Sequence, residues 1–293
     1  MMIRSRFLRL TLLVATLVSG SFAQAQAPRG GGAPPAAPTA ETAALNKVGD
    51  ALGSRRTTRF ANARSVIAYM FTASGSMSEP APGGRWTSYR VSRFTGEYSY
   101  HPFSAGVARS PGMRWDIERT DPDGRNQHRI LAAAGNVGWD QQDITGTATP
   151  VSAAITADRM RQIWLSPHGL VWAGTTNDGG AAAPGVTTAQ RNGQTVLTIP
   201  VDGAPVTVTL DKDNRPAHVE AQINHPVLGK TRWEAEYSDY KDLEDAYLVF
   251  FPGRIVHKLG GRTVLDLSVT EGHTNPYVVF PLPSGIAGGA TAK

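Results

Sequence analysis

The side chains that could do chemistry in this chain are histidines and carboxylates, and none stands in a spacing typical of a catalytic centre. The 7 histidines form no H-x-H and no H-E-x-x-H pair, the close pairs that most zinc sites contain. A G-x-S-x-G nucleophile elbow, a G-x-G-x-x-G after a strand and a phosphate-binding loop are also missing from the sequence. We therefore predict no catalytic residue, no metal site and no cofactor.

Two histidines and one acidic stretch keep a hydrolytic site open as a weaker alternative. His168 lies between a proline and a glycine, where it can be an acid, base or ligand at a cleft mouth, or a loop histidine bonded to backbone. His225 is the other histidine of this alternative. Residues 237–245, YSDYKDLED, gather acids, but a glycosidase needs two that converge on one cleft; a solvated loop or weak cation site has the same composition. The acids are Asp239, Asp242, Glu244 and Asp245.

The stretch IWLSPHGLVWAG, residues 163–174, carries two tryptophans, a histidine and a proline with almost no charge. We interpret it as the end of a short amphipathic helix, capped by Thr156, followed by a bent apolar connection, because Pro167 forces the residue before it out of a helix. The stretch is either permanent core or the removable cover of an apolar binding pocket. The predicted ligand-binding residues are Trp139, Met160, Ile163, Trp164, His168, Leu170 and Trp172.

The elements that must position these residues are mostly strands. Met113, Trp115 and Ile117 alternate with charged residues, and the same period of two recurs in four later stretches. One dry face and one wet face are typical of antiparallel sheet. The later inward-facing sets are Val206, Val208 and Leu210; Val219, Ala221 and Ile223; Trp233, Ala235 and Tyr237; and Leu265, Leu267 and Val269.

Turn dipeptides set the strand boundaries. Asn192-Gly193, Asp202-Gly203 and Gly260-Gly261 permit the positive φ angles of tight hairpins. We expect a meander of about six strands between residues 186 and 270. Earlier strands are expected near residues 65–74, 86–100, 113–120 and 128–134, after one helix that Thr39 caps and Gly53 ends.

Residues 1–27 have the layout of a secretory signal peptide. Three arginines precede the apolar run 10–18, and small residues follow, with cleavage expected near Ala25 or Ala27. The run is about half of the roughly 20 residues that a spanning helix needs. We therefore expect a periplasmic or secreted protein with no transmembrane segment in the mature chain.

Composition excludes further classes of protein. The 29 basic residues include the three leader arginines, which leaves 26 against 24 acidic residues, so we expect no nucleic-acid partner. The chain has 0 cysteines, which rules out disulfides, thiolate metal sites and a lipid-modified cysteine. We divide the chain into the signal peptide 1–27, a disordered Pro/Gly/Ala linker 28–40, a single domain 41–276 and a flexible tail 277–293.

Three segments, IWLSPHGLVWAG, NHPVLG and YSDYKDLEDAYLVFFPGRIVHKLGGRTVLDLSVTEGHTNP, are similar to the region that precedes the zinc domain in certain exported metallo-β-lactamase-fold hydrolases. The resemblance runs from about Ser65 to Pro276. It implies the LolA/LolB-like lipoprotein-carrier fold, an α+β fold in which a curved antiparallel half-barrel has a few helices covering its concave face. It also implies a capacity to hold apolar cargo.

The hydrolase activity itself does not carry over. The signature H-x-H-x-D-H is missing, the chain ends soon after VVFPLPSG, and Ala246 and Tyr247 stand where the family often has a glycine. We therefore expect an exported, non-catalytic protein that binds a lipid, a lipoprotein acyl chain or another apolar ligand. The alternative is an accessory module for a separate envelope enzyme such as a metallo-hydrolase, and the third possibility is a hydrolase with an unrecognised site.

Overall fold

The computed structural model describes residues 37–55, 65–100, 111–176, 180–225, 227–244 and 248–276, together with positions 280, 282, 283 and 286. The chain from Pro38 to Lys293 forms one compact unit. The predicted signal peptide, most of the linker and most of the tail lie outside the described residues, as do Asp245, Ala246 and Tyr247.

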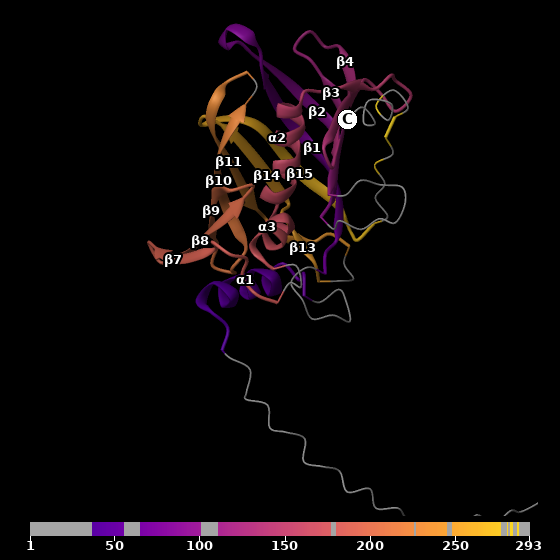
Figure 1. The fold of residues 1–293 in the computed structure, drawn as a ribbon. Coiled ribbons are helices and arrows are strands. Elements are labelled where there is room, and N and C mark those ends of the chain that lie inside the picture. The colour runs from indigo at the N-terminus through magenta and orange to yellow at the C-terminus, as the bar shows by residue number, and fades with distance from the viewer. Residues whose placement is uncertain are drawn as a thin grey trace, which may run out of the picture. The chain divides into compact units, whose positions relative to one another are not determined.

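The compact unit is built on one 13-stranded antiparallel sheet, in the order β6-β5-β4-β3-β2-β1-β15-β14-β11-β10-β9-β8-β7. Two meanders meet where β1 pairs with β15. Figure 1 shows the sheet curving around the helices α2 and α3, which lie on its concave side. The predicted fold class, an α+β half-barrel of antiparallel strands with a few covering helices, is therefore confirmed.

The elements have the following bounds. The first meander contains β1 (Ala68–Pro80), β2 (Trp86–Ser99), β3 (Gly112–Thr120), β4 (Asn126–Ala134), β5 (Val137–Gln141) and β6 (Thr149–Pro150), with a 3-10 turn η1 (Pro82–Gly84) after β1. The second contains β7 (Thr187–Arg191), β8 (Gln194–Val201), β9 (Ala204–Leu210), β10 (Pro216–His225), β11 (Gly229–Ser238), β14 (Arg254–Leu259) and β15 (Arg262–Thr274). The short strands β12 (Lys241–Asp242) and β13 (Phe250–Phe251) pair separately, and the helices are α1 (Ala40–Ala51), α2 (Ala153–Leu165) and α3 (Pro167–Gly174).

The period-two pattern places the core as predicted. Every inward-facing residue expected from the alternation is buried, from Met113 and Ile117 at 0% exposure to Trp115 at 9%. The three hairpin dipeptides have positive φ at both residues, as at Asn192 (52°) and Gly193 (79°). The alternation of apolar and polar residues, together with the turn dipeptides, therefore determines which face of each strand is buried.

Strand number and helix ends needed correction. The second meander has seven strands in the main sheet, and β5 and β6 were not expected, because both are short and carry little alternation. Ser152, rather than Thr156, caps α2: its hydroxyl accepts a hydrogen bond from the Ile155 amide at 3.3 Å, and Thr156 donates to the Ser152 carbonyl from inside the helix. Thr39 caps α1 and Gly53 follows its end with φ 73°, both as predicted.

The stretch after Ser166 is a helix, not the bent connection that we expected. Ser166 has extended backbone, as the following proline requires, but its side chain also caps α3, and Pro167 stands in the first turn of α3. Proline suits that position because its missing N–H has no partner there in any helix. The proline thus ends one helix and begins the next.

Candidate functional site

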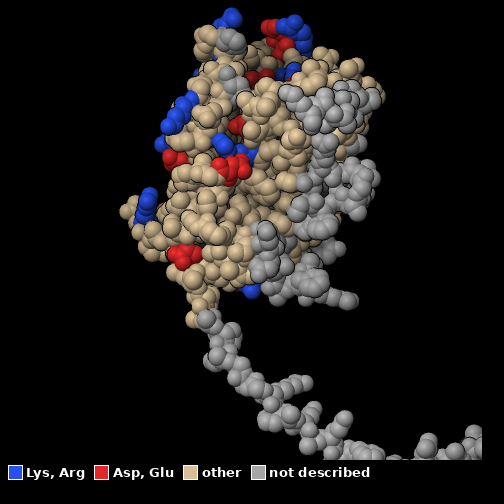
Figure 2. All heavy atoms as spheres, in the orientation of Figure 1, with Lys and Arg blue, Asp and Glu red and all other residues tan. Residues whose placement is uncertain are grey.

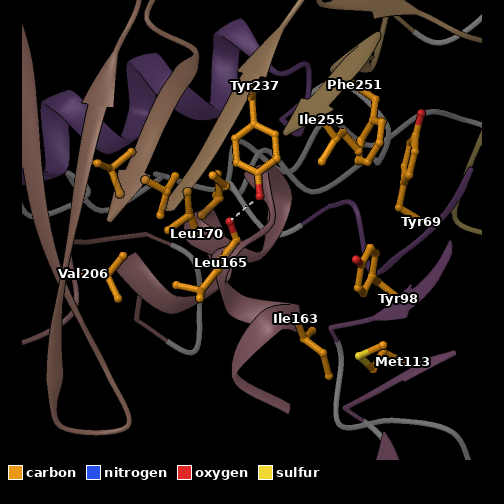
Figure 3. Packing of buried hydrophobic residues seen from close by; sticks show 14 of the residues in the cluster. Tyr69, Tyr98, Met113, Ile163, Leu165, Leu170, Val206, Tyr237, Phe251 and Ile255 are labelled. Carbon is orange, nitrogen blue, oxygen red and sulfur yellow. Dashed lines mark hydrogen bonds between the residues drawn. The ribbon is translucent and has the colours of Figure 1, made fainter. Parts of the chain in front are cut away.

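The segment 163–174 belongs to the core. Ile163 is 0% exposed, Leu170 2% and Trp172 7%. The Trp172 indole N–H donates to the Val66 carbonyl at 2.7 Å, so its polar edge is satisfied inside the protein. These residues fill the space between the two meanders, as Figure 3 shows around Ile163, Leu165 and Leu170.

Hydrogen bonds from buried hydroxyls fix the junction of α2 and α3. The Tyr237 hydroxyl donates to the Leu165 carbonyl at 3.0 Å (Figure 3). The Ser166 hydroxyl donates to the Ile163 carbonyl at 2.7 Å and lies 3.1 Å from the Tyr100 hydroxyl. Because the single Ser166 hydrogen is used in the first bond, Tyr100 is the donor in the second.

Burial makes this junction a permanent part of the fold. Ile163, Leu165, Leu170, Val171 and Trp172 are all buried, and burying such side chains contributes roughly 1.5–3 kcal/mol each. Lifting the segment would therefore cost on the order of 10 kcal/mol, as much as a whole domain's stability.

His168 lies inside this core and not at a cleft mouth. It is 0% exposed, and its ring stacks on Tyr69, with centroids 5.6 Å apart, and on Phe251 at 6.3 Å. Neither ring nitrogen makes a hydrogen bond of good geometry within the described chain. Burial lowers the pKa of His168 to about 4, a shift that the Phe250 backbone opposes, so the ring is neutral at pH 7.

The three other predicted ligand-binding residues lie outside this fully buried group. Met160 and Trp164 are half-buried and pack against the main core. Trp139 lies on β5 in a separate apolar cluster with Phe280 and Ile286, and its indole N–H lies 3.3 Å from the Gln141 side-chain oxygen. The structure thus joins Ile163, His168, Leu170 and Trp172 in one core and places Trp139 apart.

An apolar pocket remains on the concave side, next to the second and third turns of α2. Its volume is about 170 Å³. Asp158 and Gln162 line it from the helix, and the ends of β1, β10 and the β14–β15 hairpin line it at the upper end of the half-barrel in Figure 1. The lining residues are Met77, Ser78, Glu79, Pro80, Trp115, Leu131, Asp158, Gln162, Ile223, His225, Trp233, His257, Leu259, Val264 and Leu265.

The buried part of this lining is apolar apart from one histidine. The buried apolar surface of the pocket includes Trp115, Ile223 and Trp233. His257 is the buried polar residue among the described lining. The His257 ring lies 5.0 Å from the Trp233 ring, and burial lowers its pKa to about 4. The deep wall therefore offers an uncharged surface at neutral pH.

Three of the half-exposed polar residues of the pocket, Asp158, Gln162 and His225, interact with one another. The Gln162 amide donates to an Asp158 carboxylate oxygen at 3.1 Å, and the buried Gln162 carbonyl oxygen has no partner among the described residues. Burial raises the pKa of Asp158, which the Gln162 hydrogen bond partly offsets. Burial also lowers the pKa of His225, against the pull of Asp158.

The tautomer of His225 follows from its contacts. Its Nδ1 accepts hydrogen bonds from the Val227 and Leu228 amides, both at 3.2 Å. A neutral imidazole that accepts at Nδ1 carries its proton on Nε2. His225 therefore presents an N–H donor at Nε2.

Two larger hollows lack an apolar wall. One of about 510 Å³ lies over Arg90, Glu118 and His128, and one of about 470 Å³ lies over Arg129, Asp140 and neighbouring polar residues. Every residue that lines them is polar or glycine. Figure 2 shows charged side chains at the upper end of the drawn face, along its left margin and in a group near its middle, with uncharged surface between them.

Two of the described acids of the stretch 237–245 bind backbone amides. Asp242 accepts from the Leu248 amide at 2.8 Å, and Glu244 accepts from the Thr274 amide at 2.8 Å. Within the described ranges, no group of three or more His, Asp or Glu side chains could hold a metal ion. No described helix has the length and apolar character needed to cross a membrane.

Sequence reasoning had assigned the pocket wall to the core. The alternation of the strands marks as inward-facing Trp115, Ile223, Trp233 and Leu265. The sequence signal for a pocket is a pair of polar residues, Asp158 and Gln162, spaced i,i+4 on the inner side of an amphipathic helix. No protein-family model and no curated protein matches this chain. The similarity to the lipoprotein-carrier fold therefore stays a prediction.

Proposed function

We propose that this chain is an exported, non-catalytic protein that binds an apolar ligand, such as an acyl chain of a lipid or lipoprotein, inside its half-barrel. The observation that carries the proposal is the pocket with the Trp115–Trp233 wall beside α2. Ligand sites are concave and mostly apolar, with a few convergent polar groups. The signal-peptide pattern of residues 1–27 supports an exported role.

The size of the pocket sets what it can hold. A volume of about 170 Å³ lies near that of a cavity of roughly 150 Å³ that binds benzene, and below the range of about 300–1,000 Å³ for drug-sized ligands. The pocket therefore takes one end of an acyl chain or a small apolar group. The rest of a longer ligand would extend through the open side.

Binding of eight-carbon amphiphiles to the full chain tests this proposal. We expect ligand-observed NMR to show saturable binding of 1-octanol, with competition by other octyl compounds. Ile223→Trp should abolish binding, because a larger ring in the buried wall fills the pocket. Gln222→Trp adds the same ring to the outer face of β10, where residue 222 is exposed, and should bind as the parent does.

Two results would overturn the proposal. One is the lack of saturable binding by any octyl compound to folded protein. The other is equal binding by the Ile223→Trp and Gln222→Trp variants, with both shown to be folded by thermal unfolding.

A further inference from the structure

We infer that Asp158, Gln162 and His225 form a head-group subsite, which selects amphiphiles with an uncharged hydroxyl or amide head over those with a free carboxylate. This inference rests on the proposed function, since it concerns the same pocket. The subsite specifies the head group of the ligand, which the apolar part of the pocket does not.

The charge of the lining is the first observation. Of the lining residues that the structure describes, two are carboxylates, Asp158 and Glu79, and none is a lysine or arginine. Glu79 is paired with Arg119 at 2.6 Å, but Asp158 has no arginine or lysine within ion-pairing distance among the described residues. The nearest arginines along α2, Arg159 and Arg161, pair with Asp140 and Asp202 instead.

Unused hydrogen-bonding capacity is the second observation. The Gln162 carbonyl oxygen is buried without a described partner, and only one oxygen of Asp158 has a described hydrogen bond, from Gln162. The second Asp158 oxygen is therefore an acceptor that a head group with a donor would satisfy, and Gln162 holds the carboxylate in place through the other oxygen. A ligand that pairs a half-buried acceptor gains affinity, because an acceptor left unpaired away from water is unfavourable.

The donor side completes the subsite. His225 offers its Nε2–H because both neighbouring amides bind Nδ1. A hydroxyl or an amide both donates and accepts, so it can pair with a carboxylate or amide oxygen and with the imidazole N–H together. A carboxylate head only accepts, and it would meet the Asp158 charge in a half-buried site where no cation lines the wall.

A matched series of octyl ligands tests the selection. At pH 8, we expect 1-octanol and octanamide to bind the full chain at least about tenfold more tightly than octanoate, measured by ligand-observed NMR titration. Asp158→Asn should raise octanoate affinity towards that of octanol while leaving octanol within about twofold. The asparagine keeps a carbonyl for the Gln162 amide, so the variant should fold.

Failure of the inference differs from failure of the proposed function. Equal or tighter binding of octanoate to the parent, or an unchanged order in Asp158→Asn, would overturn the head-group subsite while octyl binding itself survives. Octylamine distinguishes charge from hydrogen bonding: binding at least as tight as that of octanol, lost in Asp158→Asn, would mean that charge alone selects the ligand and would also overturn it.

Discussion

At the scale of single residues, two buried histidines make the stability of the protein sensitive to acid. His168 and His257 are enclosed by aromatic rings, and burial lowers the pKa of each to about 4. The residues beside His168, Pro167 and Gly169, indicate a loop or a cleft mouth and not a core position, and no motif marks His257. Their environment is set by side chains from distant parts of the chain, Tyr69 and Phe251 for one and Trp233 for the other.

We predict that the protein loses stability as the pH falls from about 6.5 to about 4. The unfolded chain protonates its histidines near pH 6.5, whereas the folded chain keeps these two neutral until about pH 4, so protons favour unfolding in that window and not above it. His168→Phe keeps an aromatic ring in the stack and should remove up to roughly 3 kcal/mol of this loss.

Urea unfolding at pH 7.5 and 4.5 measures the effect. A His168→Phe variant whose free energy of unfolding falls as much as the parent's would contradict the prediction.

At the scale of elements, the Ser166 side chain determines where one helix ends and another begins. It caps α3 through the Gly169 amide at 3.3 Å, donates to the Ile163 carbonyl and accepts from Tyr100. Proline at position 167 indicates that a helix ends here. It does not indicate that a second helix starts, because the cap depends on a serine whose side chain can serve either helix.

We predict that Ser166→Ala destabilises the protein by about 2 kcal/mol, since it removes a cap and leaves the buried Tyr100 hydroxyl without this partner. Tyr100→Phe in the same protein should recover part of the loss, with a coupling of at least about 0.5 kcal/mol in the double-mutant cycle. The free energies of unfolding of the four proteins give this coupling. Strict additivity would exclude the Tyr100–Ser166 bond as a stabilising contact.

At the scale of the whole molecule, the β1–β15 pairing turns two meanders into one half-barrel. Gly75 lies at an irregularity of β1 with φ 155°, and a Cβ there would stand 2.0 Å from the Asp266 carbonyl oxygen. Only glycine allows the two backbones to approach this closely. The pairing of β1 with β15 therefore requires glycine at position 75.

Gly75→Ala should cost about 3 kcal/mol more than Gly124→Ala in thermal or urea unfolding. Gly124 also has positive φ (82°), but a Cβ there meets nothing within 4 Å, so its substitution measures backbone strain alone, about 1 kcal/mol. The difference between the variants isolates the clash with β15. Equal losses of unfolding free energy in the two variants would show that the β1–β15 pairing tolerates a side chain at position 75.

The sequence by itself determined which residues face inward along β3, β9, β10, β11 and β15, and where the tight hairpins turn, because both depend on residues near each other in the chain. Only the tertiary structure decided which inward-facing residues border a pocket. Trp115 and Trp233 have the same apolar alternation as full core residues, and they border a hollow because α2 presents Asp158 and Gln162 there instead of a filling apolar side chain. That gap arises between strands and a helix far apart in sequence, so no local pattern encodes it.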